Sequence, residues 1–324
     1  MKVLKSSQVS ILALVFMFSC KTDDKKIITM VIPASIEAFK QIEAGLREVC
    51  TDSLYYTRVF SAEGDASKFN TAIDAALLTK PNYFVAIGSQ VVTSVFSGKY
   101  QAKMPPTIAG SISIPSSVSA LEELGINPPR KFPLNIVSQV PFSSYSKLVN
   151  VIFDIKPATK KIGIIYNEAE INSKNMKNIF VDIISKSSAK PLLGAVTSAE
   201  DVYNITNKLI RDGAEAIIIP HDKSATTKAA TIAKLCSENN VISCCLDDGI
   251  IKDGIMFAVS VQYKEVGKLI GKIIRDANEN HKDLKQMPIV EIEDKDVHIF
   301  INSKTFEEKE IKLSEQYISQ IINL

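Results

Sequence analysis

One pattern recurs along most of this chain: a short apolar run with strand character is followed by a stretch in which apolar residues return every three or four positions. The pattern extends from residue 27 to about residue 110, and it starts again after residue 140. Short apolar runs bounded by turn residues favour buried strands, and the longer spacing favours helices with one apolar face. The alternation predicts an α/β fold in which parallel sheets carry helices on both faces.

The first half of the body illustrates the pattern. Ile36, Phe39 and Ile42 lie at helical spacing after an apolar run that ends at Pro33. Asp65 is suited to cap the next helix, because its side chain can accept a hydrogen bond from the first helical turn. We expect strands at residues 27–33, 54–60, 83–87 and 106–110, and helices at residues 35–49, 65–79 and 88–97.

Residues 111–130 interrupt the pattern, because Ser, Pro and Gly dominate there and favour irregular structure. Further along, we expect Ser198 to cap a helix that Gly213 ends. The remaining strands are expected at residues 135–140, 161–166, 191–196, 216–220, 241–246, 255–259, 289–292 and 297–301. The remaining helices are expected at residues 143–153, 172–187, 198–212, 224–239 and 265–278, with charged helical turns near the end.

Two similar halves that meet near residue 140 predict two doubly wound parallel-sheet lobes, Rossmann-like and joined by a hinge. We expect later segments to cross back between the lobes. The N-terminal lobe is then expected to hold residues 27–139 plus about 262–284, and the C-terminal lobe residues 140–261 plus about 285–324. The carboxyl ends of the strands border one shared crevice, which is where such sheets bind ligands.

The N-terminal residues predict export. Lys2 and Lys5 precede an apolar run at residues 9–18, which in helical form spans about 15 Å, roughly half the hydrocarbon core of a membrane. We therefore expect residues 1–19 to be a signal peptide. Cys20 follows the apolar run directly and resembles the lipidated residue of a bacterial lipoprotein, with residues 20–26 as a lipidated tether. Ordinary secretion and an uncleaved membrane anchor are the alternatives.

Composition and motifs exclude several classes of function. The chain has 38 Lys and Arg against 36 Asp and Glu, and this near-balance excludes a nucleic-acid binder that depends on bulk charge. Three histidines and five scattered cysteines make a zinc ribbon improbable. The sequence has no Gly-x-Ser-x-Gly, no P-loop and no Gly-x-Gly-x-x-Gly motif. We expect no enzyme activity, no catalytic residue, no metal and no cofactor, and a monomer.

Four cysteines follow Cys20, and export would permit them to form disulfides. They are Cys50, Cys236, Cys244 and Cys245. Residues 241–246 are mostly apolar and have strand character, which favours inert thiols in the core. A disulfide from Cys236 to Cys244 or Cys245 remains the alternative.

Several stretches match the motifs of one protein family in the correct order between residues 27 and 300. They are Pro33-Ala34, Glu43-Ala44-Gly45-Leu46, Glu63-Gly64-Asp65, Lys80 to Ser89, Lys161 to Asn167, Asn172-Ser173, Ile219-Pro220-His221-Asp222, and Tyr263 with Gly267. The ordered set resembles the solute-binding proteins of ABC importers with a type I periplasmic-binding-protein fold, in the branch that includes tryptophan- and other aromatic-amino-acid-binding lipoproteins. Ile32, Val261 and the segment 111–113 depart from the family pattern at the cleft edge, which bears on ligand identity.

Polar residues at the predicted strand ends are the candidate ligand contacts. Ser89 and Gln90 begin a helix after a strand, where free N–H groups and the positive helix end attract a carboxylate. The resemblance also implies ligand contact at this turn, and a plain capping role is the alternative. Ser111 and Ser113 end the next predicted strand and are further candidates.

In the second half, Tyr166 and Asn167 end a strand, and Asn172 and Ser173 start the following helix. The Tyr166 ring could stack on a planar ligand or simply pack beneath the loop. Asn172 and Ser173 could donate hydrogen bonds to a ligand or cap their own helix. These residues are the candidates from the second lobe, with both interpretations open.

Carboxylates follow two further strands. Asp222, Asp247 and Asp248 are placed there, and one of the three is expected to bind a ligand ammonium, because a charge-assisted hydrogen bond compensates its desolvation. We select Asp222 and Asp247 as site residues, with His221 at the surface. The others would be caps or surface charges.

The resemblance implies an extracytoplasmic lipoprotein that captures a small amino-acid-like solute, aromatic ones included, between two lobes. Its partners would be the solute, an ABC permease and, through the lipid anchor, the bacterial cell envelope at the periplasmic or outer face of a membrane. A nucleoside-type receptor and a ligand-sensing partner of a membrane signalling protein are the alternatives. No partner nucleic acid is expected.

Overall fold

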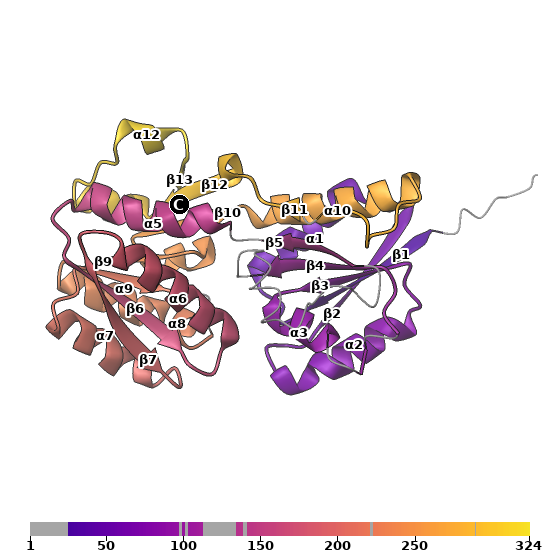
Figure 1. The fold of residues 1–324 in the computed structure, drawn as a ribbon, viewed down its shortest axis with the longest axis horizontal. Helices are drawn as coiled ribbons and strands as arrows, with labels where there is room; N and C mark the ends of the chain where they lie inside the picture. The colour runs from indigo at the N-terminus through magenta and orange to yellow at the C-terminus, as the bar shows by residue number, and fades with distance from the viewer. Residues whose placement is uncertain are drawn as a thin grey trace, which may run out of the picture.

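The structure is a computed structural model, and it describes residues 25–96, 99–100, 103–112, 134–138, 141–220, 223–288 and 290–324. The predicted signal peptide, Cys20, Ser113 and Asp222 lie outside the described residues, as does most of the irregular segment 111–130. The described chain forms two α/β lobes, each built on its own sheet (Figure 1). The predicted fold class is confirmed.

The first lobe is built on a six-stranded sheet in the order β11-β5-β4-β3-β1-β2, and its described pairings are parallel. Its strands are β1 (Lys26–Ile32), β2 (Tyr55–Ser61), β3 (Tyr83–Ile87), β4 (Thr107–Ile112), β5 (Leu134–Ser138) and β11 (Val290–Glu291). Every residue of β3 is buried, as expected for a strand that helices cover on both faces. The order reverses at β1, which lies between β2 and β3.

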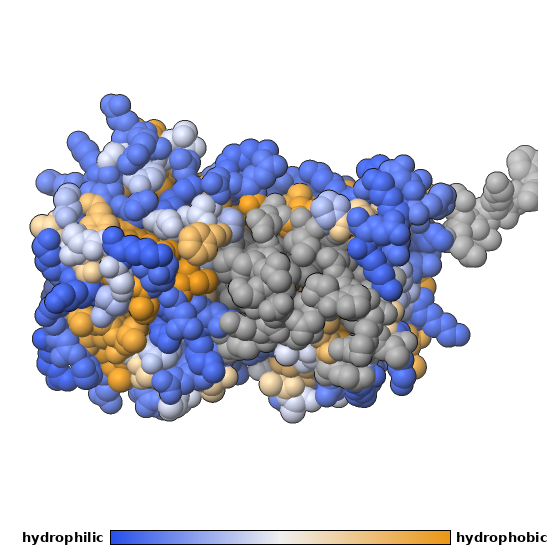
Figure 2. Space-filling model, viewed as in Figure 1, coloured by the Kyte–Doolittle hydropathy of each residue, from blue (hydrophilic) through white to orange (hydrophobic). Residues whose placement is uncertain are grey.

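The helices of the first lobe cover its sheet, and all but α10 follow strands of that sheet. They are α1 (Glu37–Val49), η1 (Ala66–Lys68), α2 (Phe69–Leu78), α3 (Ser89–Val95) and α10 (Tyr263–Glu279). Asp65 caps as predicted, since its carboxylate accepts a 2.9 Å hydrogen bond from the N–H of Ser67, although the turn it caps is the short 3-10 helix η1. The outer surface over α10 is largely hydrophilic (Figure 2).

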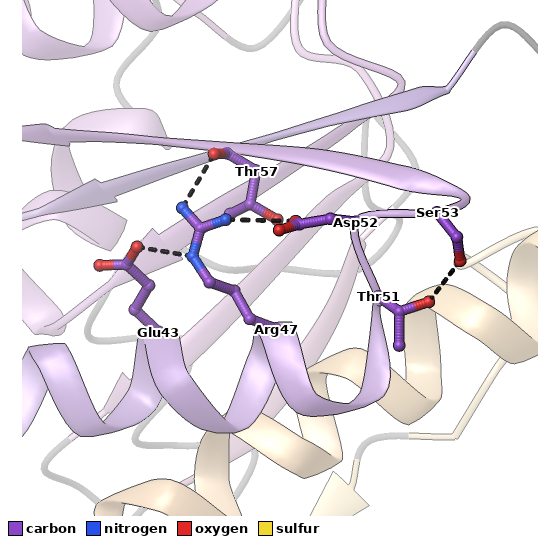
Figure 3. A network of polar contacts seen from close by, with 6 residues as sticks. All are labelled: Glu43, Arg47, Thr51, Asp52, Ser53 and Thr57. Carbon is purple, nitrogen blue, oxygen red and sulfur yellow. Dashed lines mark hydrogen bonds and ion pairs between the residues drawn. The ribbon is translucent and has the colours of Figure 1, made fainter.

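Arg47 fastens α1 to the neighbouring strand β2. Its guanidinium donates to Glu43 Oε1 at 2.8 Å and to the carbonyl oxygen of Thr57 at 3.0 Å (Figure 3). Asp52 lies 3.6 Å from the same group. Because the planar guanidinium has several donors in fixed directions, it can join one helix residue and one strand residue at once.

The second lobe is built on a seven-stranded sheet in the order β13-β12-β10-β9-β8-β6-β7. Its strands are β6 (Lys161–Asn167), β7 (Lys190–Val196), β8 (Ala216–Ile219), β9 (Ile242–Cys245), β10 (Phe257–Val261), β12 (Val297–Ile301) and β13 (Ile321–Asn323). Strand β12 runs antiparallel to β10, whereas the other described pairings of this sheet are parallel. As in the first sheet, the order reverses at one strand, here β6 between β7 and β8.

The helices of the second lobe are α5 (Phe142–Ile155), α6 (Ile171–Ser185), α7 (Asp201–Arg211), α8 (Lys223–Thr227), α9 (Ala229–Glu238), η2 (Asp248–Asp253), η3 (Asp294–Asp296), α11 (Ser303–Glu308) and α12 (Glu315–Ile318). Two predictions are wrong in detail here. The helix expected at residues 224–239 is divided at Lys228. Ser198 does not cap α7; its N–H instead donates to the carboxylate of Asp201, a stronger acceptor because it is charged.

The chain passes between the lobes before α5, between β10 and α10, and between β11 and β12 (Figure 1). Strand β11 pairs with β5 in the first sheet, through Val290 with Val137 and Glu291 with Ser138. Residues 290–291 therefore belong to the first lobe, and the return to the second lobe comes later than the predicted boundary at residue 285. The reason is that this short segment pairs with the free edge of β5 over two residues.

Helices α1 and α10 approach each other more closely than side chains would allow. A Cβ atom on Gly45 would lie 2.0 Å from the carbonyl oxygen of Lys264, and a Cβ on Gly267 would lie 2.0 Å from the carbonyl oxygen of Ile42. Gly271 follows one turn later and faces Val49. Both glycine motifs noted in the sequence therefore serve backbone-to-backbone helix packing. This packing assigns α10, which follows a strand of the second sheet, to the first lobe.

The four described cysteines are free and buried. The core interpretation is confirmed, and the alternative disulfide from Cys236 is wrong. Cys236 and Cys245 belong to the apolar cluster on one side of the second sheet, where packing with neighbours such as Ile232 leaves them as small apolar side chains. Among the described residues, no helix has the length and apolar character that crossing a membrane requires.

Candidate functional site

The candidate site is located by the two reversals of strand order. In doubly wound sheets, ligands bind outside the carboxyl ends of the strands at the reversal. In the first lobe this point lies after β1 and β3, where Pro33 and Gly88 follow the strands. In the second lobe it lies after β6 and β8, beside Asn167.

Asn167 organises the strand ends of the second lobe. Its side-chain amide donates to Ser224 Oγ at 3.0 Å, and its side-chain oxygen accepts from the N–H of Ala169 at 2.8 Å. Its backbone N–H donates to Ser173 Oγ at 2.9 Å. Asn167, Ser173 and Ser224 are all buried. The network therefore joins β6 with the first turns of α6 and α8, and it fixes the shape of this edge.

Ser224 belongs to the network of the candidate site, and the sequence analysis missed it. It was expected only as the start of a helix, yet its hydroxyl accepts the Asn167 amide across the reversal point of the sheet. Of the other predicted residues, Asn172 is buried in the first turn of α6, next to Ser173. The signal that could have found Ser224 is its place directly after β8, the neighbour of β6 in the predicted doubly wound order.

Tyr166 lies beneath this edge, and both its hydroxyl and its ring contact neighbouring side chains. Its hydroxyl donates to Glu168 Oε1 at 3.1 Å, and Lys177 Nζ lies 5.2 Å from its ring centroid. Burial, with Glu168 as the next cause, raises the pKa of the Tyr166 hydroxyl. Tyr166 is only 9% exposed, so its side chain is packed beneath the edge in this structure, and stacking on a ligand stays a prediction.

Asp247 and Asp248 follow β9 and have different environments. Asp247 Oδ1 accepts hydrogen bonds from the hydroxyl of Tyr263 and from the N–H of Gly249, each at 3.0 Å. Asp248 is half-buried, and its Oδ1 is a buried atom with no hydrogen-bond partner among the described residues. Burial, and secondarily the charge of Asp247, raises the pKa of Asp248 to about 7. One carboxylate is thus held in place, and the other is short of a compensating positive group.

In the first lobe, Ser89 follows β3, and Ser111 lies near the end of the neighbouring strand β4. Gly88 precedes Ser89 with a φ of 82°, and its N–H donates to the carbonyl oxygen of Gly110 at 2.9 Å. Gly88 takes the N-cap position of α3, so the alternative in which Ser89 caps this helix is wrong. Ser89 is buried, whereas Gln90 is exposed.

Ser111 has an unusual backbone conformation. Its φ is 54°, a region that residues with a side chain seldom adopt, and the register of β4 with β5 shifts between Gly110 and Ile112. Ser111 is nevertheless buried. Strained backbone of this kind concentrates at functional sites, where surrounding structure holds it.

The strand ends of the two lobes face each other. Lys223, the first residue of α8, reaches across from the second lobe, and its Nζ donates to the carbonyl oxygen of Gly64 at 3.3 Å. Gly64 follows β2 in the first lobe. The contact brings the segment that starts α8 next to the turn after β2, so the two lobes meet at this point.

A cavity of about 840 Å³ lies elsewhere, between α10 and the segment that leads to β11. Its lining includes Leu269, Ile273, Met287 and Val290, with Lys272 and Asp276 among the charged residues. No predicted site residue contributes to it. The cavity is therefore separate from the strand ends.

Comparison with known proteins settles the family. A family model described as ABC transporter substrate binding protein matches residues 28–321. The chain belongs to this family. Proteins of this family work outside the cytoplasm, bind a small molecule and act with an ABC transporter. The resemblance identified from the sequence motifs is confirmed.

Individual relatives agree with the family. A tyrosine-binding protein of Clostridioides difficile is 22% identical over 188 residues, which are 58% of this chain and 53% of that protein, so the match spans about half of the relative. A structure of an ABC domain in complex with L-Trp from Streptococcus pneumonia has a TM-score of 0.74 and 17% identity, covering 92% of this chain and 99% of the other. The ligand-free, open structure of a substrate binding protein with adhesive properties from Clostridium difficile has a TM-score of 0.72 and 16% identity, with the same coverage. The structural similarities support the fold.

Proposed function

We propose that this protein captures an amino acid, with aromatic amino acids as the preferred class, between its two lobes and delivers it to an ABC importer. The observation that supports the proposal is the set of polar residues at the strand ends: Ser89 follows β3 and Ser111 lies near the end of β4 in one lobe, and two carboxyl groups follow β9 in the other. An amino acid zwitterion has one group for each side. The named ligands of the relatives, tyrosine and L-Trp, support the same class.

The ligand carboxylate would bind at the first lobe. Ser89 and Ser111 offer hydroxyl donors, and the backbone turn at Gly88 holds them close to each other. Donors to an ionised acceptor form hydrogen bonds stronger than neutral pairs. Ser113, outside the described residues, would extend this donor set.

The ligand ammonium would bind at the second lobe. Asp247 is held by Tyr263, and Asp248 lacks a partner for one buried oxygen among the described residues. An ammonium placed beside them would neutralise the repulsion between the two carboxyls and compensate their burial. Asp222, also outside the described residues, remains a candidate for the same role.

We further propose that the protein is an exported lipoprotein without catalytic activity that works as a monomer. Cys20 would carry the lipid, and the polar residues that follow would be the tether. Cys20→Ser should move the protein from the detergent phase to the aqueous phase after phase separation of cells that express it. Wild-type protein recovered in the aqueous phase would contradict lipid anchoring and would leave the ligand-binding proposal intact.

A thermal-shift screen of the full chain in detergent, with the twenty amino acids and common nucleosides, tests the binding function. Ligand at 100 times its Kd stabilises the folded state by about 2.7 kcal/mol. We expect L-tryptophan, L-tyrosine or L-phenylalanine to raise the Tm. Tryptamine, which lacks the carboxylate, and indole-3-propionate, which lacks the ammonium, are the matched controls and should raise it far less. A shift with nucleosides alone would contradict the proposal and favour the nucleoside-type receptor.

A further inference from the structure

The Lys223 contact between the lobes is built from two firmly held segments. On the first lobe, Glu63 and Gly64 have φ values of 53° and 74°, so the turn after β2 reverses sharply. The N–H of Gly64 donates to the carbonyl oxygen of Pro33 at 2.8 Å, and the N–H of Ala62 donates to that of Ile32 at 3.1 Å. These bonds tie the turn to the end of β1 and fix the direction of the Gly64 carbonyl.

On the second lobe, the backbone of Lys223 is fixed just as firmly. Its N–H donates to Glu170 Oε1 at 3.2 Å, at the N-cap of α6. Its carbonyl oxygen accepts from Thr227 Oγ1 at 2.6 Å. The next residue, Ser224, binds Asn167 at the strand ends. The ammonium of Lys223 is therefore carried by the same segment that forms the candidate site.

Charge also acts across the gap. Lys223 is among the cations that lower the pKa of Asp65, after the hydrogen bonds from Ser67 and the nearer Lys68. The ammonium thus contacts the Gly64 carbonyl, and its charge also acts on a carboxylate of the opposite lobe. The bond is already 3.3 Å long, so a lobe rotation that separates Lys223 from Gly64 by a few ångströms more would break it.

We propose that Lys223 acts as a clasp that holds the two lobes together before a ligand binds. A ligand that needs the closed form binds with an apparent Kd equal to its intrinsic Kd divided by the closed fraction. The clasp raises that fraction. Loss of the clasp must then raise the apparent Kd of every ligand by one common factor. Loss of a direct ligand contact would instead raise the Kd values of different ligands by different factors. The effect on affinity rests on the proposed function, but the effect on closure does not.

Hydrogen–deuterium exchange of the full chain in detergent, without added amino acid, tests closure directly. Lys223→Met removes the charge and keeps most of the side chain. Lys234→Met is the matched control, because Lys234 is an exposed cation of α9 that pairs only weakly with Glu238, at 3.9 Å. We expect Lys223→Met to speed exchange in the peptide of residues 61–66, in the opposite lobe, by roughly two- to five-fold, the effect expected for one exposed charge contact.

Three results of the exchange experiment have definite meanings. Faster exchange in Lys223→Met alone, with protection restored in Lys223→Arg, supports the clasp. Unchanged exchange, or equal increases in both Met variants, overturns it. If Lys223→Met fails to fold, 0.5 M NaCl replaces it, since salt screens this exposed contact and should speed exchange of residues 61–66 in the wild type but not in a Lys223→Gln chain.

Titration calorimetry with L-tryptophan and L-tyrosine tests the consequence for affinity. Lys223→Met should raise both Kd values by the same factor of roughly two to five. Unequal factors, or unchanged Kd values in a variant whose exchange has increased, would overturn the link between clasp and affinity. If the wild type binds neither amino acid, the proposed function fails, and the exchange experiment still decides whether the clasp exists.

Discussion

The hydroxyl of Tyr263 donates a hydrogen bond to Asp247 Oδ1 over 3.0 Å. Tyr263 opens α10, which packs on α1 in the first lobe, whereas Asp247 follows β9 in the second lobe. The bond therefore joins the lobes beside the connection from β10 to α10. It also holds one carboxylate at the strand ends in a defined position.

Removing this bond should weaken both the fold and ligand capture. Tyr263→Phe should lower the free energy of unfolding by about 1–2 kcal/mol, because a hydrogen bond to a charged group contributes more than a neutral one. The affinity for an aromatic amino acid should fall as well, since Asp247 loses its orientation. Urea unfolding followed by circular dichroism measures the first effect. Tyr203→Phe on α7, where Tyr203 is 55% exposed, is the control and should change neither quantity.

The two carboxyls after β9 predict a pH dependence of stability. The pKa of Asp248 is raised from 3.8 to about 7 in the folded state, so between these values the folded protein holds a proton that the unfolded chain releases. The free energy of unfolding should then fall as pH rises through this window, by on the order of 2–4 kcal/mol for this group. Asp248→Asn should flatten that decline. A variant that loses stability between pH 5 and pH 8 as steeply as the wild type would contradict the assignment.

The close approach of α1 and α10 predicts that their glycines tolerate no side chain. Gly267→Ala would place a methyl group 2.0 Å from the carbonyl oxygen of Ile42, so the helices must separate. We expect a loss of about 3 kcal/mol or more in the free energy of unfolding. Lys272→Ala, at an exposed position of the same helix, should stay within about 0.5 kcal/mol of the wild type. Equal stability of the two variants would show that the helices are not in backbone contact.

The network around Asn167 predicts a cost for a single missing hydroxyl. Ser224→Ala leaves the buried amide of Asn167 without its acceptor, which should cost about 1–3 kcal/mol and loosen the strand ends. The Kd for the amino acid should rise in the same variant. Ser237→Ala, at an exposed position of α9, is the control. Thermal unfolding and calorimetry of both variants give the comparison.

The buried cysteines predict slow alkylation. Burial raises the pKa of both Cys50 and Cys236 to about 12, so very little thiolate exists at neutral pH. Mass spectrometry after iodoacetamide treatment should find the four cysteines that follow Cys20 unmodified in the folded chain. All four should react in urea without prior reduction. A requirement for reductant would contradict the free thiols.

Much of the fold was predictable because local pattern and burial agree. The bounds of β3 and β12 match the expected strands, since each is a short apolar run with clear turn signals on both sides. The later parts were harder. Strand β11 is only two residues long, and its place depends on the free edge of β5, which no local pattern encodes. The strand itself was expected at residues 289–292, and only its lobe was wrong. Strand β13 was missed, because it is three residues long and its pairing depends on the free edge of β12.

The site was less predictable than the fold. Strand ends could be located, so Ser89, Asn167 and Asp247 were placed there correctly, and their contact with a ligand stays a prediction. Ser224 and Lys223 were not, because their contacts join segments about 57 and 159 residues apart in the sequence. Likewise, the sequence singled out Gly267 as part of a motif, but only the structure gives its role in helix packing.

The account depends on an amino acid lying between the facing strand ends. A crystal structure of the full chain grown with saturating L-tryptophan or L-tyrosine tests this most directly. We predict ligand density with its carboxylate within hydrogen-bonding distance of Ser89 or Ser111, and its ammonium beside Asp247 or Asp248. Ligand bound only in the cavity along α10, or strand ends that stay empty at saturation, would contradict the account.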